Sequence, residues 1–147
     1  MALKIANVFI NEDDPIPLII MSSTELESYV KGYHVYKDIW TPVVNEELKT
    51  EMEPGNVKDN YAVCVKKNTS IVGHLPLGTN GKFAKMIFFF LRADQDAKCN
   101  VVITGKAVNL GDGDGMQVPC KLKISGTKKM VEILCNNIQC SDTKSAM

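Results

Sequence analysis

The clearest structural signal in the sequence lies at residues 62–75, which read AVCVKKNTSIVGHL. The first four residues are small or β-branched and apolar, so they predict a buried strand. Turn-forming residues follow at 67–70, and residues 71–75 return to an apolar pattern. This stretch therefore predicts a β-hairpin, in which Gly73 marks a tight corner or a point where another backbone approaches closely.

The sequence downstream of this hairpin predicts a buried helix followed by further strands. From Phe83 to Leu91, apolar residues recur at i, i+3, i+4, i+7 and i+8, which places them on one helical face. Strands are expected at residues 100–108 and 118–125, and an amphipathic helix at residues 128–139.

Upstream of the hairpin, the signals are more local. Residues 33–40 are rich in aromatic and β-branched side chains and predict a strand, as do residues 48–53. Ser22 and Glu25 have the spacing of a capping box, which predicts a short helix that ends before Gly32.

These elements together indicate a mainly β or α+β fold, in which strands form a small β-barrel with one buried helix. Residues 1–28 are interpreted as an N-terminal extension to this barrel, and residues 29–126 as the barrel domain. Residues 127–147 then form a C-terminal helix and a frayed tail.

Length and composition are those of a single globular domain. The chain has 147 residues, of which 45% are hydrophobic and 23% charged. The longest uninterrupted apolar run, Met86 to Leu91, is too short to span a bilayer, so no membrane partner is expected. The N-terminus has no secretory signal pattern, and the 5 cysteines include no C-x-x-C pair. An intracellular protein, nuclear or cytoplasmic, with reduced thiols is therefore expected.

The formal net charge is zero, but the charges are unevenly distributed. Residues 1–60 carry 5 Lys and 11 Asp or Glu, a net charge of −6, whereas residues 61–147 carry 12 Lys or Arg and 6 acids, a net charge of +6. This asymmetry allows a basic face that binds phosphates, but on charge alone ordinary solvated surface is the favoured explanation, because a dedicated nucleic-acid domain is usually more basic.

Catalytic and metal-binding motifs are weak throughout. His34 and His74 fall in different expected strands, and Cys64 lies in an apolar strand that disfavours a thiolate. The loop from Gly111 to Gly115 is rich in Gly and Asp, but the position of the bidentate calcium ligand is Lys123. We therefore expect no enzyme, no metal and no cofactor; a remnant nuclease is a weak third hypothesis, because no acidic cluster has metal-ligand spacing.

Two segments remain informative. In residues 53–63, a proline turn leads into a buried strand, and Asn56 and Asp59 are placed either to bind the backbone of their own loop or to bind a ligand. In residues 71–76, a short strand that contains Gly73 ends at a proline, which suits a binding surface or a barrel corner.

In order and spacing, these segments resemble the HIRAN domain, a small module of helicase-like transcription factors of the SNF2 type. The resemblance covers about residues 29–126. It rests on five features: Gly32-Tyr33-His34-Val35-Tyr36, then Glu53-Pro54-x-Asn56-x-x-Asp59-x-x-Ala62-Val63-x-Val65, then Val72-Gly73-His74-Leu75, a following apolar helix, and Val118-Pro119-Cys120-Lys121-Leu122.

The resemblance implies an OB-like β-barrel that binds single-stranded DNA, or a free 3′ end of DNA, within a larger protein machine. The positions that match the family's binding site are His34, Tyr36, Asn56, Lys58, Asp59 and His74. In this interpretation Tyr36 stacks a base, Asp59 accepts a hydrogen bond from the 3′-hydroxyl, and His74 lies beside phosphate. Further phosphate contacts are expected from Lys66, Lys67, Lys82 and Lys85.

The chain also departs from the family pattern. Val35 and Lys58 stand where the family carries aromatic residues, and Pro76 and Leu77 follow His74-Leu75 where the family can carry lysines. The alternative function is therefore a protein-interaction module that keeps the barrel without the DNA pocket. Such a module would use a surface around Tyr33 and Trp40 or an exposed edge strand.

Overall fold

The computed structural model describes residues 4–5, 8–9, 19–78, 81–111, 113 and 115–138. Lys4–Ile5 (β1) and Val8–Phe9 (β2) pair as a small antiparallel sheet. The strands of the main sheet are β3 (Met21–Val30), β4 (Glu47–Glu53), β5 (Ala62–Lys67), β6 (Ser70–His74), β7 (Lys98–Ile103), β8 (Val108–Asn109) and β9 (Met116–Thr127). The helices are α1 (Tyr33–Tyr36), α2 (Lys82–Ala93) and α3 (Lys128–Ile138).

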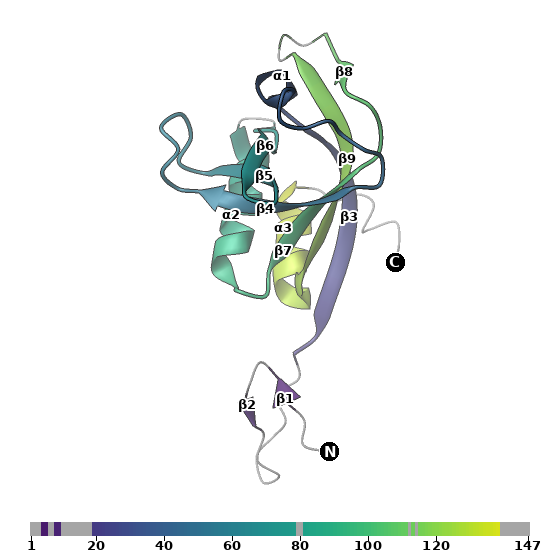
Figure 1. The fold of residues 1–147 in the computed structure, drawn as a ribbon. Helices are drawn as coiled ribbons and strands as arrows, with labels where there is room; N and C mark the ends of the chain where they lie inside the picture. The colour runs from purple at the N-terminus through teal and green to yellow at the C-terminus, as the bar shows by residue number, and fades with distance from the viewer. Residues whose placement is uncertain are drawn as a thin grey trace.

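The main sheet is antiparallel and has the order β3-β9-β7-β4-β5-β6, with β8 paired to β9 (Figure 1). Its two edges meet at one bridge, where Lys31 N donates to His74 O at 2.9 Å and His74 N donates to Lys31 O at 3.0 Å. We call this contact the seam. The sheet curves until its edges touch at the seam but is otherwise not closed, so the expected barrel is an open one.

The core lies between this sheet and two helices that pack against each other. Helix α2 contacts β5, and α3 contacts β3 and β9 (Figure 1). Their buried side chains include Ile87, Phe88 and Phe90 from α2 and Val131 and Leu134 from α3. The sequence-based predictions of the 62–75 hairpin, both of these helices and the strands β4, β7 and β9 are confirmed.

The helix predicted from the capping box at Ser22 is wrong. Met21–Val30 is a strand that pairs residue by residue with Val118–Thr127 of β9. Alternate side chains point inward, and Thr24 and Val30 are buried while Glu25 and Glu27 are exposed. Long-range pairing along ten residues therefore outweighs a local capping signal. The sequence-based domain boundary at residue 28 falls inside β3.

The strand predicted over residues 33–40 is also wrong. Gly32 has a left-handed φ of 83°, and the chain turns there into the short helix α1. The amides of Ile39 and Trp40 both donate to Tyr36 O, which continues the turn. The turn buries Trp40, whose indole Nε1 donates to Glu46 Oε1 at 3.0 Å. Because Trp40 is only 3% exposed, it cannot contribute to the surface around Tyr33 and Trp40 that the alternative protein-interaction module would use, and Tyr33 is half-buried.

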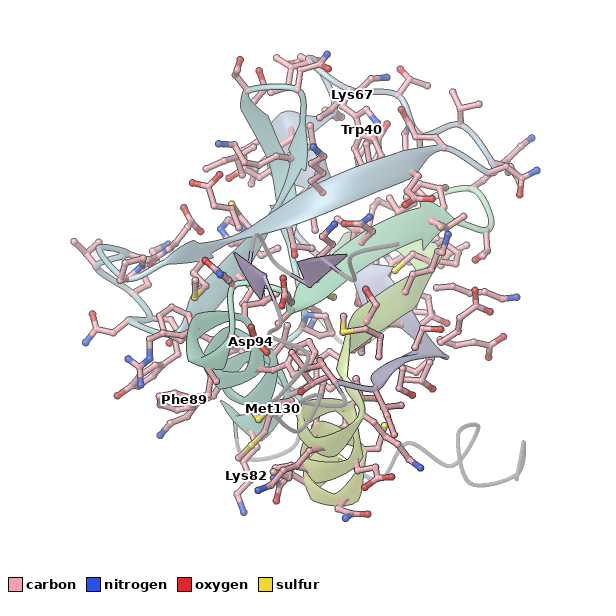
Figure 2. All side chains as sticks on the ribbon, turned by 90° about the horizontal axis from the view of Figure 1, so that it is seen from below. Trp40, Lys67, Lys82, Phe89, Asp94 and Met130 are labelled. Carbon is pink, nitrogen blue, oxygen red and sulfur yellow. The ribbon has the colours of Figure 1, made fainter. Side chains whose placement is uncertain are left out.

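The polar contacts of Glu46 and the partly exposed side chains of α2 and α3 lie at opposite ends of the domain. Figure 2 shows Trp40 beside Lys67, and both bond to the Glu46 carboxylate. Phe89 and Met130 lie on the opposite side of the same view. No helix among the described residues is long and apolar enough to cross a membrane.

The cysteines of the described residues should resist alkylation in the folded protein. Cys64, Cys99, Cys120 and Cys135 are buried, and none of these four is in a disulfide. Burial raises the pKa of the Cys64 thiol to about 11, and the nearby carboxylates of Glu53 and Glu51 contribute to this shift. Burial also raises the pKa values of Cys99 and Cys120 to about 12. Only the thiolate reacts, so iodoacetamide at pH 8 should label these sites slowly, and labelling should accelerate in urea. Immediate labelling of Cys64 in the native protein would contradict its core position.

Candidate functional site

A cavity of about 780 Å³ lies at the seam. Its walls come from the end of β3, α1, the β4–β5 loop, β6 and the start of α2. A volume of this size is within the range of ligand-binding clefts. The cavity exists because the curved sheet brings residue 31 and residue 74 together, so it is formed by segments far apart in the sequence.

Five of the six residues predicted as a binding site line this cavity: Tyr36, Asn56, Lys58, Asp59 and His74. The sixth, His34, does not line it. Its exposed ring lies instead against the backbone of Gly115, where an added Cβ would be 2.8 Å from His34 Nδ1. The structure therefore groups five predicted residues and separates the sixth.

The β4–β5 loop is held in shape by its own polar side chains. Asn56 Oδ1 accepts hydrogen bonds from the amides of Lys58 and Asp59 at 2.9 and 3.1 Å. Asp59 Oδ1 accepts from the Tyr61 amide at 2.9 Å. Both residues thus have the structural role considered in the sequence analysis. A carboxylate has two oxygens, however, and Asp59 keeps acceptor capacity on a half-buried side chain that faces the cavity.

His74 is fixed at three places. Its backbone forms the seam, its Nε2 lies 2.6 Å from Glu53 Oε1, and its ring centroid is 6.5 Å from that of Tyr36. Burial raises the pKa of Tyr36, and the nearby Glu53 and Cys64 raise it further. The Tyr36 hydroxyl therefore remains a protonated donor at neutral pH, beside an oriented imidazole.

Apolar side chains surround the polar residues of the cavity. Val35 and Leu77 line it and are 65% and 52% exposed. Val57, at the tip of the β4–β5 loop, is 99% exposed. Lys31 also lines the cavity, so two lysines and one carboxylate are placed around it. No sequence pattern predicts Lys31 as a site residue, because the seam brings it there from a distant segment. Leu77 follows His74 closely in the sequence, where it departs from the family pattern.

The other lysines proposed for phosphate contact are distributed differently. Lys66 pairs with Glu51 at 3.0 Å and Lys67 with Glu46 at 2.8 Å, and neither lines the cavity. Lys85 lies on α2 with its Nζ 4.7 Å from the ring centroid of Tyr61. Lys82 and Lys85 are therefore better placed than Lys66 and Lys67 to bind an anion that leaves the cavity along α2.

An aromatic cluster that the sequence analysis missed lies next to the loop. The Tyr61 ring is 5.5 Å from that of Phe88 and 5.2 Å from that of Phe89. Arg92 covers the two phenylalanines at 5.7 and 4.6 Å. The helical period from Phe83 to Leu91 does not include Phe89, and the structure shows that this side chain is only partly buried.

Among the described residues, no three His, Cys, Asp or Glu side chains come together as metal ligands. Asp112 and Asp114 of the glycine-rich loop lie outside these residues, as does the tail from residue 139.

No family model matches this chain, and no curated protein matches it. Three solved structures match it, and two of them have a TM-score above 0.5. The crystal structure of the HIRAN domain of human HLTF has a TM-score of 0.60 and 18% identity, over 78% of this chain and 86% of that chain. The NMR structure of the same human domain has a TM-score of 0.57 and 19% identity, over 79% of this chain and 86% of that chain. The chain therefore has a HIRAN-like fold.

Proposed function

We propose that this domain is a nonenzymatic module that binds the end of a single DNA strand in the cavity at the seam. The observation that carries the proposal is the grouping of Tyr36, Asn56, Lys58, Asp59 and His74 around one opening of about 780 Å³. A strand end presents a base, a phosphate and a terminal hydroxyl. The cavity offers an aromatic face, cationic groups and a carboxylate for these three features.

In the proposed complex, Tyr36 stacks the last base, and the exposed Val35 and Leu77 contact the edges of that base. Lys58 and Lys31 approach phosphate oxygens. A strand that continues out of the cavity passes toward Lys85 and Tyr61, where a cation already lies on an aromatic ring. The proposal needs no nucleophile, and Cys64, which pairs with His74 in the sheet, is buried with a raised pKa.

Asp59 gives the proposal its selectivity. A carboxylate near phosphates repels them unless it gains a hydrogen bond, so Asp59 favours a 3′-hydroxyl, which can donate, over a 3′-phosphate, which cannot at neutral pH. The hydrogen bond from the Tyr61 amide fixes the carboxylate in one orientation, so the second oxygen is held ready for this donor.

The test is binding of labelled oligonucleotides that carry either a 3′-hydroxyl or a 3′-phosphate, over a series of salt concentrations. We expect the affinity to fall as salt rises, because bound lysines release counterions from the phosphates. We expect tighter binding of the 3′-hydroxyl strand. An absence of binding at low salt, or binding that does not respond to salt, would contradict the proposal.

Asp59→Asn separates the binding role of Asp59 from its structural role. The variant keeps Oδ1 as an acceptor for the Tyr61 amide, so its melting temperature should stay near that of wild type. The second oxygen becomes an amide donor, which should abolish or reverse the preference for the 3′-hydroxyl. Asp59→Ala serves as the comparison, since it loses both functions and should also lose about 1 kcal/mol of stability. An unchanged end preference in Asp59→Asn would show that Asp59 only shapes its loop.

The second candidate function is recognition of a protein segment in the same cavity. The observation that favours it is the exposure of Val35 and Leu77, which line the cavity, and of Val57 in the β4–β5 loop, since exposed aliphatic side chains also suit a peptide. The salt series distinguishes the two, because binding of an apolar peptide depends little on salt.

A further inference from the structure

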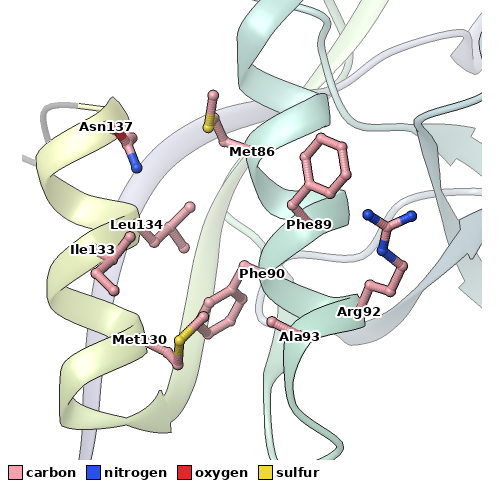
Figure 3. A pocket seen from close by; sticks show the side chains of 9 residues that line it. All are labelled: Met86, Phe89, Phe90, Arg92, Ala93, Met130, Ile133, Leu134 and Asn137. Atoms are coloured by element: carbon pink, nitrogen blue, oxygen red, sulfur yellow. The ribbon is translucent and has the colours of Figure 1, made fainter.

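A second concave surface lies between α2 and α3, away from the seam. Figure 3 shows this groove, which has a volume of about 330 Å³. Met86, Phe89 and Phe90 line it from α2, and Met130, Ile133 and Leu134 from α3. Ile133 is 43% exposed, and Met86, Phe89 and Met130 are only partly buried, so apolar surface remains open to solvent.

The two helices that form the groove are strongly basic. Helix α2 carries Lys82, Lys85 and Arg92 and no acidic residue. Helix α3 carries Lys128, Lys129 and Glu132, so the pair has five cations and one carboxylate, a net charge of +4. This surplus is local, because the outer face of the sheet pairs its lysines with glutamates, as in Lys66 with Glu51 and Lys123 with Glu47.

Arg92 marks the charged wall of the groove. Its guanidinium lies 4.6 Å from the ring centroid of Phe89, on the flank of α2 that faces away from α3 (Figure 3). Among the described residues, no carboxylate lies within ion-pair distance of Arg92, Lys82 or Lys129. Asp94 and Asp96 follow α2, where Asp94 Oδ1 accepts the Asp96 amide at 2.9 Å. The positive charge that has no carboxylate partner therefore lies along α2, whereas the two aspartates lie beyond the C-terminal end of this helix.

We propose that this groove docks an amphipathic helix of a protein partner, with apolar residues spaced at i, i+3, i+4 and i+7 and acidic residues on both sides of that stripe. The apolar stripe contacts Met86, Ile133 and Leu134. The acids pair with Arg92, which lines the groove, and with Lys129, which lies on α3 next to the lining residue Met130. An apolar floor between two basic flanks is complementary to such a helix in both shape and charge.

The shape of the surface argues against the other anionic partners. A lipid bilayer is penetrated by apolar side chains that protrude, whereas the open apolar atoms here line a hollow. The lining offers little surface on which a base can stack, because Phe90 is buried and most of the other lining residues are aliphatic or thioether. A concave aliphatic groove accepts bulky side chains from a helix.

This site is separate from the DNA-binding proposal. The residue of α2 that lines the cavity at the seam is Ala84, whereas those that line the groove are Met86, Phe89, Phe90, Arg92 and Ala93. Two faces of one helix would therefore serve two ligands. A substitution on α3, such as Ile133→Asp, therefore changes the groove and leaves the lining of the cavity at the seam intact.

The test is selection from a displayed library of helical peptides of about 18 residues, or about five turns. In the first library, every peptide carries glutamates at fixed positions on both sides of an apolar stripe, and the residues of that stripe are varied. A matched second library carries lysines in place of the glutamates. Selected peptides are then measured by fluorescence anisotropy against the wild-type chain and three variants: Ile133→Asp in the groove, Arg92→Glu on its flank, and Lys106→Glu as an exposed control with the same charge change.

We expect the acidic library alone to yield binders. Ile133→Asp should weaken them at least about tenfold, and Arg92→Glu at least about fivefold, while Lys106→Glu leaves their affinity within about twofold. Oligonucleotide binding should be unchanged in Ile133→Asp, which also shows that the variant is folded. The proposal is overturned by failure to enrich any acidic peptide, by equal enrichment from the lysine library, or by peptides that bind Ile133→Asp as tightly as wild type. It is equally overturned if loss of Ile133 affects only binding to anionic vesicles or DNA.

Discussion

Replacing Gly73 with alanine should destabilise the domain by about 3 kcal/mol or more and abolish strand-end binding. A Cβ at this position would lie 2.3 Å from Val30 Cγ1 and 2.8 Å from the carbonyl oxygen of Lys31. The latter is backbone and Val30 is fully buried, so neither can move without opening the seam. Overpacking costs about 1–3 kcal/mol, and the two seam hydrogen bonds add about 0.5–1.5 kcal/mol each.

Urea unfolding measures the loss of stability, and oligonucleotide binding measures the loss of the cavity. Gly55→Ala is the matched control. Gly55 lies in the β4–β5 loop, next in sequence to the lining residue Asn56, but an added Cβ there meets nothing within 4 Å. Its stability should stay within about 0.5 kcal/mol of wild type. Equal unfolding midpoints for Gly73→Ala and wild type would mean that the sheet edges do not meet in solution.

Tyr36→Ala should weaken binding of every single-stranded oligonucleotide by about 10- to 100-fold, whatever the chemistry of its 3′ end. The stack of one base on an aromatic ring contributes about 1–3 kcal/mol, and no other aromatic side chain among the described residues lines the cavity except the His74 imidazole. The affinity is measured at one salt concentration for both ends, so the ratio of the two affinities should remain as in wild type.

Two controls accompany this variant. Tyr36→Phe keeps the ring and removes the hydroxyl, so it should bind within about 1 kcal/mol of wild type. Tyr29→Ala removes a half-buried tyrosine of β3 that does not line the cavity and should leave binding unchanged. A Tyr36→Ala protein that melts like wild type and binds DNA equally well would exclude the cavity as the stacking site.

Much of the fold could be predicted from local pattern. The hairpin at 62–75, the helix around Phe83–Leu91 and the strand at 118–125 each carry an apolar period that matches their structure. Each of these elements is buried on at least one face, and the positions that face the core must be apolar. The spacing of apolar residues in the sequence therefore follows the period of the helix or strand. Within the site, the β4–β5 loop was equally predictable from the sequence. Asn56 and Asp59 accept hydrogen bonds from backbone amides of the same loop, so their structural role is local.

Only the tertiary structure determined β3, α1 and the cavity. β3 has a weak inward face of Ser22, Thr24, Leu26, Ser28 and Val30, and it is a strand because β9 supplies its partners. Residues 33–40 have high β-propensity, yet Gly32 turns the chain so that Trp40 reaches the core. The seam depends on the curvature of the whole sheet, which no local pattern records. The sequence by itself therefore determined which residues are apolar, which form turns and which can bind a ligand. Long-range strand pairing decided that residues 31, 36, 59 and 74 face one cavity. It did so because strand pairing stabilises the fold by more than the local conformational preference of these segments opposes it.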